Sequence, residues 1–276
     1  MFDNGNGIIM NDFRKDIVTI CIVNYKTEEL TRLCLRSIRK YTTYPYKIIV
    51  VDNNSADSSL EYLRSVPYIK LIERPGINMS GSMAHGTALD IGLNECDTEY
   101  FLAMHTDTFI RQVGWLSWLV EQINKKPNTA CTGSGKLDLK PNWQVQFKKL
   151  TDYKLWIKKY KSSDPRKYQF YIRAICALYR TYTLKKEDLK FAMDVDKGMT
   201  CAKELYFQLL LRGYNANVIS DFELGKYIYH LAHATMVINP EFKIEGRSQK
   251  KYKLKLEEIF SSPEIQSVMN DSSLDI

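Results

Sequence analysis

The sequence lacks several features that mark particular classes of protein. None of its hydrophobic runs reaches the ~18 residues that a transmembrane helix needs, and the first twelve residues have neither the basic region nor the apolar core of a signal peptide. The six cysteines are scattered singly without a C-x-x-C pair, which argues against a zinc knuckle or a disulfide framework. We therefore expect reduced, mostly buried thiols and a cytoplasmic location.

Positive charge is concentrated in the middle of the chain. The 276 residues include 39 Lys and Arg against 32 Asp and Glu, for a net charge of +7. Residues 136–190 alone hold 15 basic and 5 acidic residues, so the remainder is slightly acidic. Aromatic residues lie between these basic ones, as in surfaces that bind nucleic acid, anionic membranes or phosphorylated substrates. A solvated face is the alternative.

Strand and helix patterns alternate along the chain. Apolar, β-branched runs predict buried strands at 17–23, 46–51, 69–72, 100–104 and 171–179. Helical spacing predicts helices at 28–40, 58–65, within 76–93, from 114 and at 199–212. This alternation indicates an α/β fold with a mostly parallel sheet and right-handed crossovers.

Polar residues follow three of the predicted strands. Asn24 and Tyr25 follow the first, Asp52 and Asn53 the second, and 105–107 the strand at 100–104. Ligands of open α/β sheets bind at the carboxyl ends of strands. Each set alone could be a turn or a helix cap, but three sets at one edge favour a binding site.

Two phosphate-binding patterns are excluded. A dinucleotide site needs glycines after the first strand, and residues 24–27 contain none. Residues 132–137 faintly resemble a phosphate loop. However, Ala130 occupies the first glycine position, and Leu137 occupies the position of the hydroxyl residue that binds magnesium.

Three segments resemble the family 2 inverting glycosyltransferases with the GT-A fold. These are VTICIVNY at 18–25, IIVVDNNS at 48–55 and YFLAMHTDT at 100–108, the last in the place of the family's D-x-D segment. The similarity covers roughly residues 16–233. Within the family, the chain is similar to bacterial rhamnosyl- and galactofuranosyl-type members. It implies a GT-A-like three-layer sandwich around a Rossmann-like sheet, with a C-terminal helical extension.

We expect the chain to be organised around one such domain. A flexible leader at 1–15 would precede a GT-A domain at 16–240, with a nucleotide-binding half at 16–135 and an acceptor-side half at 136–240. A helical tail at 241–276 would follow, and its Ser/Asp-rich end is expected to fray.

The resemblance also implies the donor site. Asp52 would hydrogen-bond the base or ribose, and His105 replaces the aspartate that the family usually has at this position. His85 and Gly86 lie where the family's loop approaches the donor, although tight helix packing explains these residues equally well. The nucleotide-sugar site would comprise Val23, Asn24, Tyr25, Asp52, Asn53 and His105.

A divalent cation is implied at Asp107. This residue matches the last aspartate of the D-x-D segment, which holds a cation that bridges the donor's phosphates and stabilises the leaving diphosphate. A histidine late in the domain often closes this site in the family, which points to His233, with His230 as the other candidate. Mn²⁺ and Mg²⁺ both suit such a site, and an imidazole ligand favours manganese.

Inverting transfer also requires a base for the acceptor hydroxyl. The family uses an acidic residue near the start of a late helix, commonly in an E-D-like pair that is absent here. Asp196 is the first candidate because the dipole of the predicted helix would keep it ionised, with Glu204 second and Asp194 third. Helix capping is the alternative role for Asp196.

The resemblance therefore implies a metal-dependent enzyme that moves a sugar from a nucleotide-diphosphate donor to a hydroxyl of a glycan, lipid-linked or other acceptor. The basic stretch at 136–190 would contact the acceptor or the inner face of the membrane. A catalytically inactive nucleotide- or carbohydrate-binding relative is one alternative. A nucleic-acid-binding protein is less favoured, because no nucleic-acid motif accompanies the basic stretch.

Overall fold

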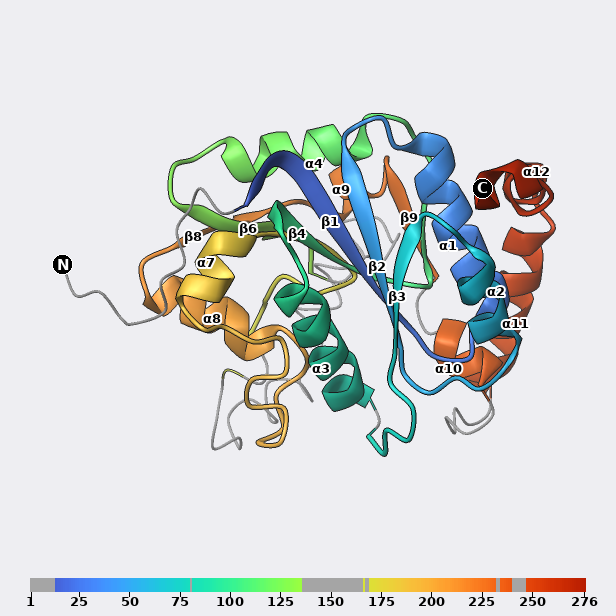
Figure 1. Cartoon of the computed structure of the whole chain (residues 1–276), viewed down its shortest axis with the longest axis horizontal. Coiled ribbons are helices and arrows are strands. Elements are labelled where there is room, and N and C mark those ends of the chain that lie inside the picture. The colour runs from blue at the N-terminus through green and yellow to red at the C-terminus, as the bar shows by residue number, and fades with distance from the viewer. Residues whose placement is uncertain (1–12, 80, 136–165, 167–168, 232–233, 240–246) are drawn as a thin grey trace.

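A seven-stranded sheet forms the centre of the molecule in a computed structural model that describes residues 13–79, 81–135, 166, 169–231, 234–239 and 247–276 (Figure 1). The strand order is β3-β2-β1-β4-β7-β6-β8. Only β7 runs antiparallel to its neighbours. The predicted α/β fold with a mostly parallel sheet is confirmed. The strands are β1 (Arg14–Asn24), β2 (Tyr46–Asp52), β3 (Ile69–Glu73), β4 (Thr98–His105), β6 (Thr129–Gly133), β7 (Cys176–Arg180) and β8 (Asn215–Val218).

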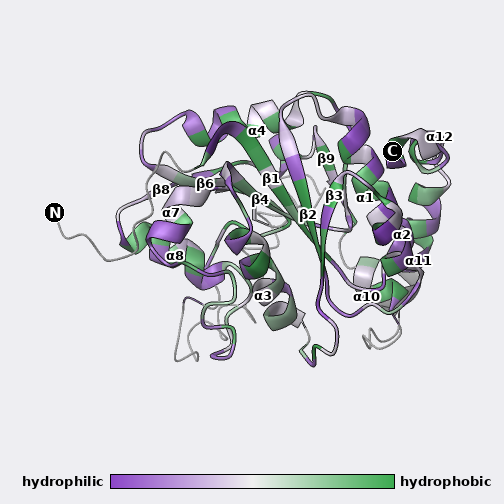
Figure 2. Ribbon diagram, viewed as in Figure 1, coloured by the Kyte–Doolittle hydropathy of each residue, from purple (hydrophilic) through white to green (hydrophobic). Residues whose placement is uncertain are grey.

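Helices cover both faces of this sheet. On one face lie α1 (Glu28–Tyr41), α2 (Ser58–Ser65) and α4 (Trp115–Asn124), and on the other α3 (Gly81–Asn94), α7 (Thr181–Lys186) and α8 (Lys203–Leu211). Successive β1 residues alternate between the two cores: Ile20 and Ile22 pack with the first group, Cys21 and Val23 with the second. Figure 2 shows hydrophobic residues concentrated on the central strands.

Two predicted elements differ from the structure. The strand expected at 171–179 begins only at Cys176. The helix expected from 199 begins at Lys203, because Ala202 before it has a left-handed backbone with φ +64°. Asp196 therefore lies in a turn well before α8, and the prediction that the helix dipole acts on it is wrong.

Beyond α8 the chain crosses back to the sheet and then forms a helical C-terminal segment. A two-stranded antiparallel ribbon pairs β5 (Thr108–Ile110) with β9 (Ile228–His230). No helix within the described residues is long and apolar enough to cross a membrane. The remaining elements are α9 (Asp221–Leu224), α10 (Ala234–Ile238), α11 (Arg247–Phe260), α12 (Pro263–Met269) and the 3₁₀ turn η3 (Ser272–Asp275).

The end of the chain packs on α1, so the expected fraying is wrong (Figure 1). Arg36 of α1 is buried, forms an ion pair with Asp275 and donates a hydrogen bond to the carbonyl of Met269. The hydroxyl of Tyr62 in α2 donates to the same Asp275 carboxylate at 2.8 Å. A third apolar cluster joins α1, the β5–β9 ribbon and α12; its buried members are Leu30, Leu33, Phe109, Leu231, Ala234, Ile265 and Val268.

Candidate active site

The polar residues that follow the strands meet at one edge of the sheet. Asn24, the last residue of β1, lies opposite Asp52, the last residue of β2. On the other side of β1, Val23 lies opposite His105, the last residue of β4. The parallel register therefore brings the three sets together, as the sequence predicts.

Asn24 and Asp52 belong to a buried hydrogen-bond network. The Asn24 amide donates to Asp52 Oδ1 at 2.7 Å, and its carbonyl accepts from the hydroxyl of Thr31 at 2.7 Å. Asp52 Oδ2 accepts the backbone N–H of Ser55 at 2.9 Å. We call this set the Asn24 network, and its members are Asn24, Thr27, Thr31, Asp52, Ser55 and Ser59.

Both central side chains of this network are buried. Asn24 is 0% and Asp52 1% exposed. Thr27, which precedes α1, donates its hydroxyl to Asn24 at 3.1 Å. The network fixes the ends of β1 and β2 against the first turns of α1 and α2.

Three of the other predicted donor residues border the network. Val23 is buried, and Tyr25 is partly exposed. Asn53 is buried, and its amide donates to the Ala84 carbonyl at 3.2 Å. Arg74 donates to Asn53 Oδ1 at 2.7 Å and to the same Ala84 carbonyl. Sequence reasoning missed Arg74, although its position directly after β3 was the available signal.

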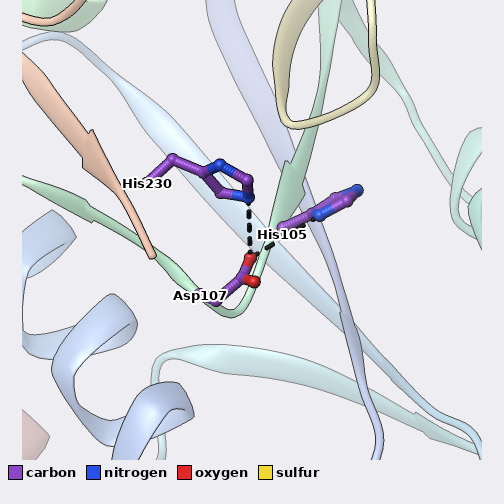
Figure 3. Close-up of side chains that lie close together, drawn as sticks. All are labelled: His105, Asp107 and His230. Carbon is purple, nitrogen blue, oxygen red and sulfur yellow. Dashed lines mark ion pairs between the residues drawn. The ribbon is translucent and has the colours of Figure 1, made fainter. Parts of the chain in front are cut away.

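His105, Asp107 and His230 form the centre of the site (Figure 3). Asp107 lies in the tight turn between β4 and β5, and β5 pairs Thr108 with His230 of β9. His230 Nε2 is 3.2 Å and His105 Nδ1 is 3.6 Å from Asp107 Oδ1. The structure thus joins two residues predicted for the metal site with one predicted for the donor.

The electrostatics of this centre keep Asp107 ionised. Burial by itself raises the pKa of Asp107, but the charges and contacts of His230 and His105 outweigh it, and the pKa lies well below its usual range. Asp107 Oδ1 and His230 Nδ1 nevertheless have no hydrogen-bond partner among the described residues. Buried polar atoms left without partners are unusual in a native protein.

A divalent cation fits these residues. One ligand atom from each of His105, Asp107 and His230 lies within 4.8 Å of the other two. Two imidazole nitrogens and one carboxylate oxygen suit manganese or another first-row transition metal better than magnesium, which prefers oxygen. Asp107 Oδ1, which forms ion pairs with both histidines but no hydrogen bond among the described residues, supplies the carboxylate ligand atom.

A third histidine, His85 of α3, extends this centre. Its ring packs edge-to-face on His105 with centroids 4.6 Å apart. Burial, with a smaller effect of His105, lowers the pKa of His85 to about 3, so the ring is neutral near pH 7. A β-carbon at Gly86 would lie 2.9 Å from Ala192 Cα, so a larger residue would not fit there without a shift. The tight helix packing that the sequence left open as an explanation for Gly86 is therefore present.

Two of the base candidates, Asp194 and Asp196, lie in the turns that follow Phe191 and Ala192, and these two residues pack against α3. Asp90 of α3 accepts the backbone N–H groups of Phe191 and Ala192, which fixes the start of this segment. Asp196 is exposed, whereas Asp194 forms an ion pair with Lys197 at 2.9 Å.

Glu204 is held inside the protein. Its carboxylate is 3% exposed and forms an ion pair with Arg166 at 3.0 Å, and it accepts a hydrogen bond from Gln208. Within the described ranges, neither Glu204 nor Asp196 has a hydrogen bond or ion pair with the central three residues.

Some predicted residues lie outside the described part of the chain. These are His233 and most of the basic stretch, residues 136–165 and 167–168. Within the described part of that stretch, Arg180 binds Asn124 and the Thr129 carbonyl, and Lys185 binds the carbonyls of Asn94 and Cys96. These two basic residues have structural roles.

Comparison with known proteins gives relatives of one kind. The curated match is the teichoic acid poly(glycerol phosphate) polymerase of Staphylococcus epidermidis, 30% identical over 115 residues, which are 39% of this chain and 15% of that protein. This chain therefore spans only a small part of that relative's length.

Solved structures share the fold at low sequence identity. The S. aureus protein TarS superposes with a TM-score of 0.52 at 17% identity, over 89% of this chain and 72% of TarS. The mannosyltransferase PcManGT from Pyrobaculum calidifontis, in complex with GDP-Man and Mn²⁺, gives a TM-score of 0.54 at 14% identity, over 92% and 72%.

A family model decides the assignment. The model described as "Glycosyl transferase family 2" matches residues 19–186, more than half of the chain, and includes β1, β2 and the β4 end that carries His105 and Asp107. The chain belongs to glycosyl transferase family 2 and has the GT-A fold.

Proposed function

We propose that the protein is a metal-dependent, inverting glycosyltransferase that uses a nucleotide-diphosphate sugar. The observation that carries this proposal is the group of His105, Asp107 and His230 at the carboxyl edge of the sheet. The relative PcManGT was solved with GDP-Man and Mn²⁺, and TarS with UDP, which supports the same kind of donor here. The donor's diphosphate would lie at this edge beside Asp107, and its base would lie next to Val23 and Tyr25.

His105, Asp107 and His230 would hold the cation, with manganese preferred because two of the three ligands are nitrogen. When bound, the cation neutralises the charge that accumulates on the departing diphosphate. His233 remains a further candidate ligand. The Asn24 network contributes by holding the ends of β1 and β2 in place, so that the partly exposed Tyr25 is presented to the base.

Asp196 is the proposed base for the acceptor hydroxyl. It is exposed, and its segment is anchored to α3 beside His85 through Gly86 and Asp90. In the inverting reaction the carboxylate takes the hydroxyl proton while the oxygen attacks the anomeric carbon from the face opposite the leaving diphosphate. Glu204, the second candidate, would first have to leave Arg166, and Asp194 its ion pair with Lys197.

The acceptor is proposed to be an anionic, phosphate-containing glycan or lipid-linked chain. Residues 136–190 carry a net charge of +10, which favours a polyanion. The polymerase relative is named for poly(glycerol phosphate), which is a polyanion. We also propose a cytoplasmic enzyme that contacts the inner face of the membrane through the same basic stretch.

The donor proposal is tested by calorimetric titration of UDP, dTDP and GDP, each with Mn²⁺, Mg²⁺ or EDTA. We expect one diphosphate to bind with Mn²⁺, to bind more weakly with Mg²⁺ and to be lost in EDTA. Binding that is unchanged by EDTA would contradict the metal assignment. Nucleotide binding without turnover of any donor sugar would identify a binding protein instead.

The acceptor and membrane proposals need separate measurements. Sugar transfer to poly(glycerol phosphate) is compared with transfer to an uncharged glycan of similar length. Preference for the uncharged glycan would contradict the acceptor proposal. Co-sedimentation with liposomes that contain or lack acidic lipid tests membrane contact, and equal sedimentation with both would reject it.

A further inference from the structure

His85 has a buried nitrogen that no described residue satisfies. Its Nε2 has no hydrogen-bond partner, although the ring lies against His105 at a centroid distance of 4.6 Å. Leaving such an atom unpaired lowers the stability of the folded state. The position therefore calls for a partner that is not part of the described chain.

The fold holds His85 in a fixed place. The preceding carbonyl, that of Ala84, accepts hydrogen bonds from Asn53 and Arg74. On the other side, Gly86 packs so closely on Ala192 that a larger residue could not enter without a shift. Because both neighbours are fixed, the first turns of α3 hold the imidazole beside the metal candidates.

Unpaired buried atoms are concentrated at this site. Four side-chain atoms within the described ranges are buried without a hydrogen-bond partner, and three of them belong to His85, Asp107 and His230. The fourth is the hydroxyl of Tyr179, which lies in the apolar core with its ring 5.2 Å from that of Phe191. Orphaned atoms gathered around one carboxylate indicate a place that a polar ligand completes.

We propose that His85 is a donor-binding residue whose Nε2–H donates a hydrogen bond to a phosphate oxygen of the bound nucleotide diphosphate. This inference rests on the proposed function, because the diphosphate would bind at His105, Asp107 and His230. An imidazole N–H group suits this position, because it is a single, directed hydrogen-bond donor that the surrounding packing holds in place.

Three variants separate this role from packing. His85→Phe keeps an aromatic ring against His105 but removes the nitrogen, and His85→Gln restores an N–H donor of similar reach. Tyr179→Phe is the matched control, because it removes the other unpaired buried atom from the apolar core. Each protein is titrated with Mn²⁺ alone, with Mn²⁺ and inorganic pyrophosphate, and with Mn²⁺ and each of UDP, dTDP and GDP.

We expect His85→Phe to bind Mn²⁺ as the wild type does but pyrophosphate and the preferred diphosphate about tenfold or more weakly, since a hydrogen bond to a charged group is lost. His85→Gln should recover part of this loss, and Tyr179→Phe should match the wild type. Unchanged diphosphate binding by His85→Phe would overturn the proposal. Loss of Mn²⁺ binding itself would do the same, because His85 would then act by positioning His105.

Three outcomes need to be distinguished. If His85→Phe fails to fold, His85→Gln is compared with His85→Ala, and equal losses of diphosphate affinity by both would reject the hydrogen bond. If the wild type binds Mn²⁺ but none of the diphosphates, the proposed function itself fails and this inference fails with it. If the wild type binds a diphosphate and His85→Phe binds it equally well, only the inference fails.

Discussion

Two polar clusters lie beside each other at the carboxyl edge of the sheet, and they differ in how completely their hydrogen bonds are made. In the Asn24 network, donors and acceptors of β1, β2, α1 and α2 satisfy one another. At and around Asp107, three buried atoms have no hydrogen-bond partner among the described residues, although Asp107 Oδ1 forms ion pairs with His105 and His230. A contact of 3.5 Å between the hydroxyls of Thr27 and Thr106 connects the two clusters.

This difference distinguishes a cluster with a structural role from the cluster that we propose to be functional. A satisfied buried network adds rigidity and specifies one arrangement of the chain. A cluster with unpaired atoms reduces stability and is retained where a ligand completes it. The same edge of the sheet thus carries the Asn24 network and the group around Asp107. Substitutions in the network should mainly lower the free energy of unfolding, and substitutions around Asp107 should mainly reduce sugar transfer.

The largest expected effect is on activity. Asp107→Asn should reduce sugar transfer by about 10³-fold, because the amide cannot replace the charge that would hold the cation. Its free energy of unfolding in urea should also fall, because the contacts with His230 and His105 that hold the pKa of Asp107 low stabilise the folded state. Asp188→Asn, at an exposed aspartate that follows α7, is the control and should leave both unchanged. A large loss of stability with unaltered transfer would reverse the comparison.

Asn24→Ala should have the opposite profile. Removal of this fully buried amide leaves Asp52, Thr31 and two serine hydroxyls with fewer partners, so we expect a loss of about 3 kcal/mol in unfolding free energy. Thr31→Val, which removes a single donor, should cost about 1 kcal/mol. Urea denaturation measures both, and equal costs would show that the network is not centred on Asn24.

His105→Asp tests how the ligand atoms choose the metal. A second carboxylate in place of the imidazole should shift the ratio of Mn²⁺ to Mg²⁺ affinity at least tenfold towards Mg²⁺, because the hard cation prefers oxygen. Titrations of both metals into wild type and variant give this ratio. An unchanged ratio would show that His105 is not a metal ligand and would favour the role in donor binding that the sequence analysis gives it.

The last prediction concerns Asp90, whose carboxylate accepts the backbone N–H groups of two residues. Burial raises the pKa of Asp90 to about 6, although the amides of Phe191 and Ala192 oppose this. The native state therefore binds the proton more tightly than the unfolded chain does, and the resulting stability is lost as the pH rises through 6. Relative to Asp90→Asn, the wild type should lose about 2 kcal/mol between pH 4 and pH 7. A pH-independent difference in urea denaturation would contradict this.

Much of the fold follows from local patterns. Buried parallel strands read as continuous apolar runs, and the strands around Ile20, Val50 and Leu102 are found where they were predicted. The polar edge was predictable for the same reason, because the carboxyl ends of parallel strands coincide. Asp107 was named from the strand order and the family resemblance together, whereas His230 was the second candidate after His233, which lies outside the described residues.

The features that were missed depend on contacts between distant residues. Arg36 and Asp275 are far apart in sequence, so no local pattern distinguishes their pairing from a frayed acidic end. The start of α8 was misplaced because the left-handed backbone at Ala202 has no glycine or asparagine to announce it. The place of His85 beside His105 depends on the packing of α3 against Ala192, which periodicity does not describe.

The docking of the chain's end on α1 has a consequence for the order of folding. Residues 14–52 can form β1, α1 and β2 from contacts that are close in sequence, whereas the pairing of Arg36 with Asp275 must close a very long loop. We therefore expect α12 to join after the transition state, so that substitutions at Ile265 and Val268 accelerate unfolding and leave the refolding rate nearly unchanged. The same late step buries Phe109 and Leu231, so the ribbon that carries His230 would reach its final position only when the last residues arrive.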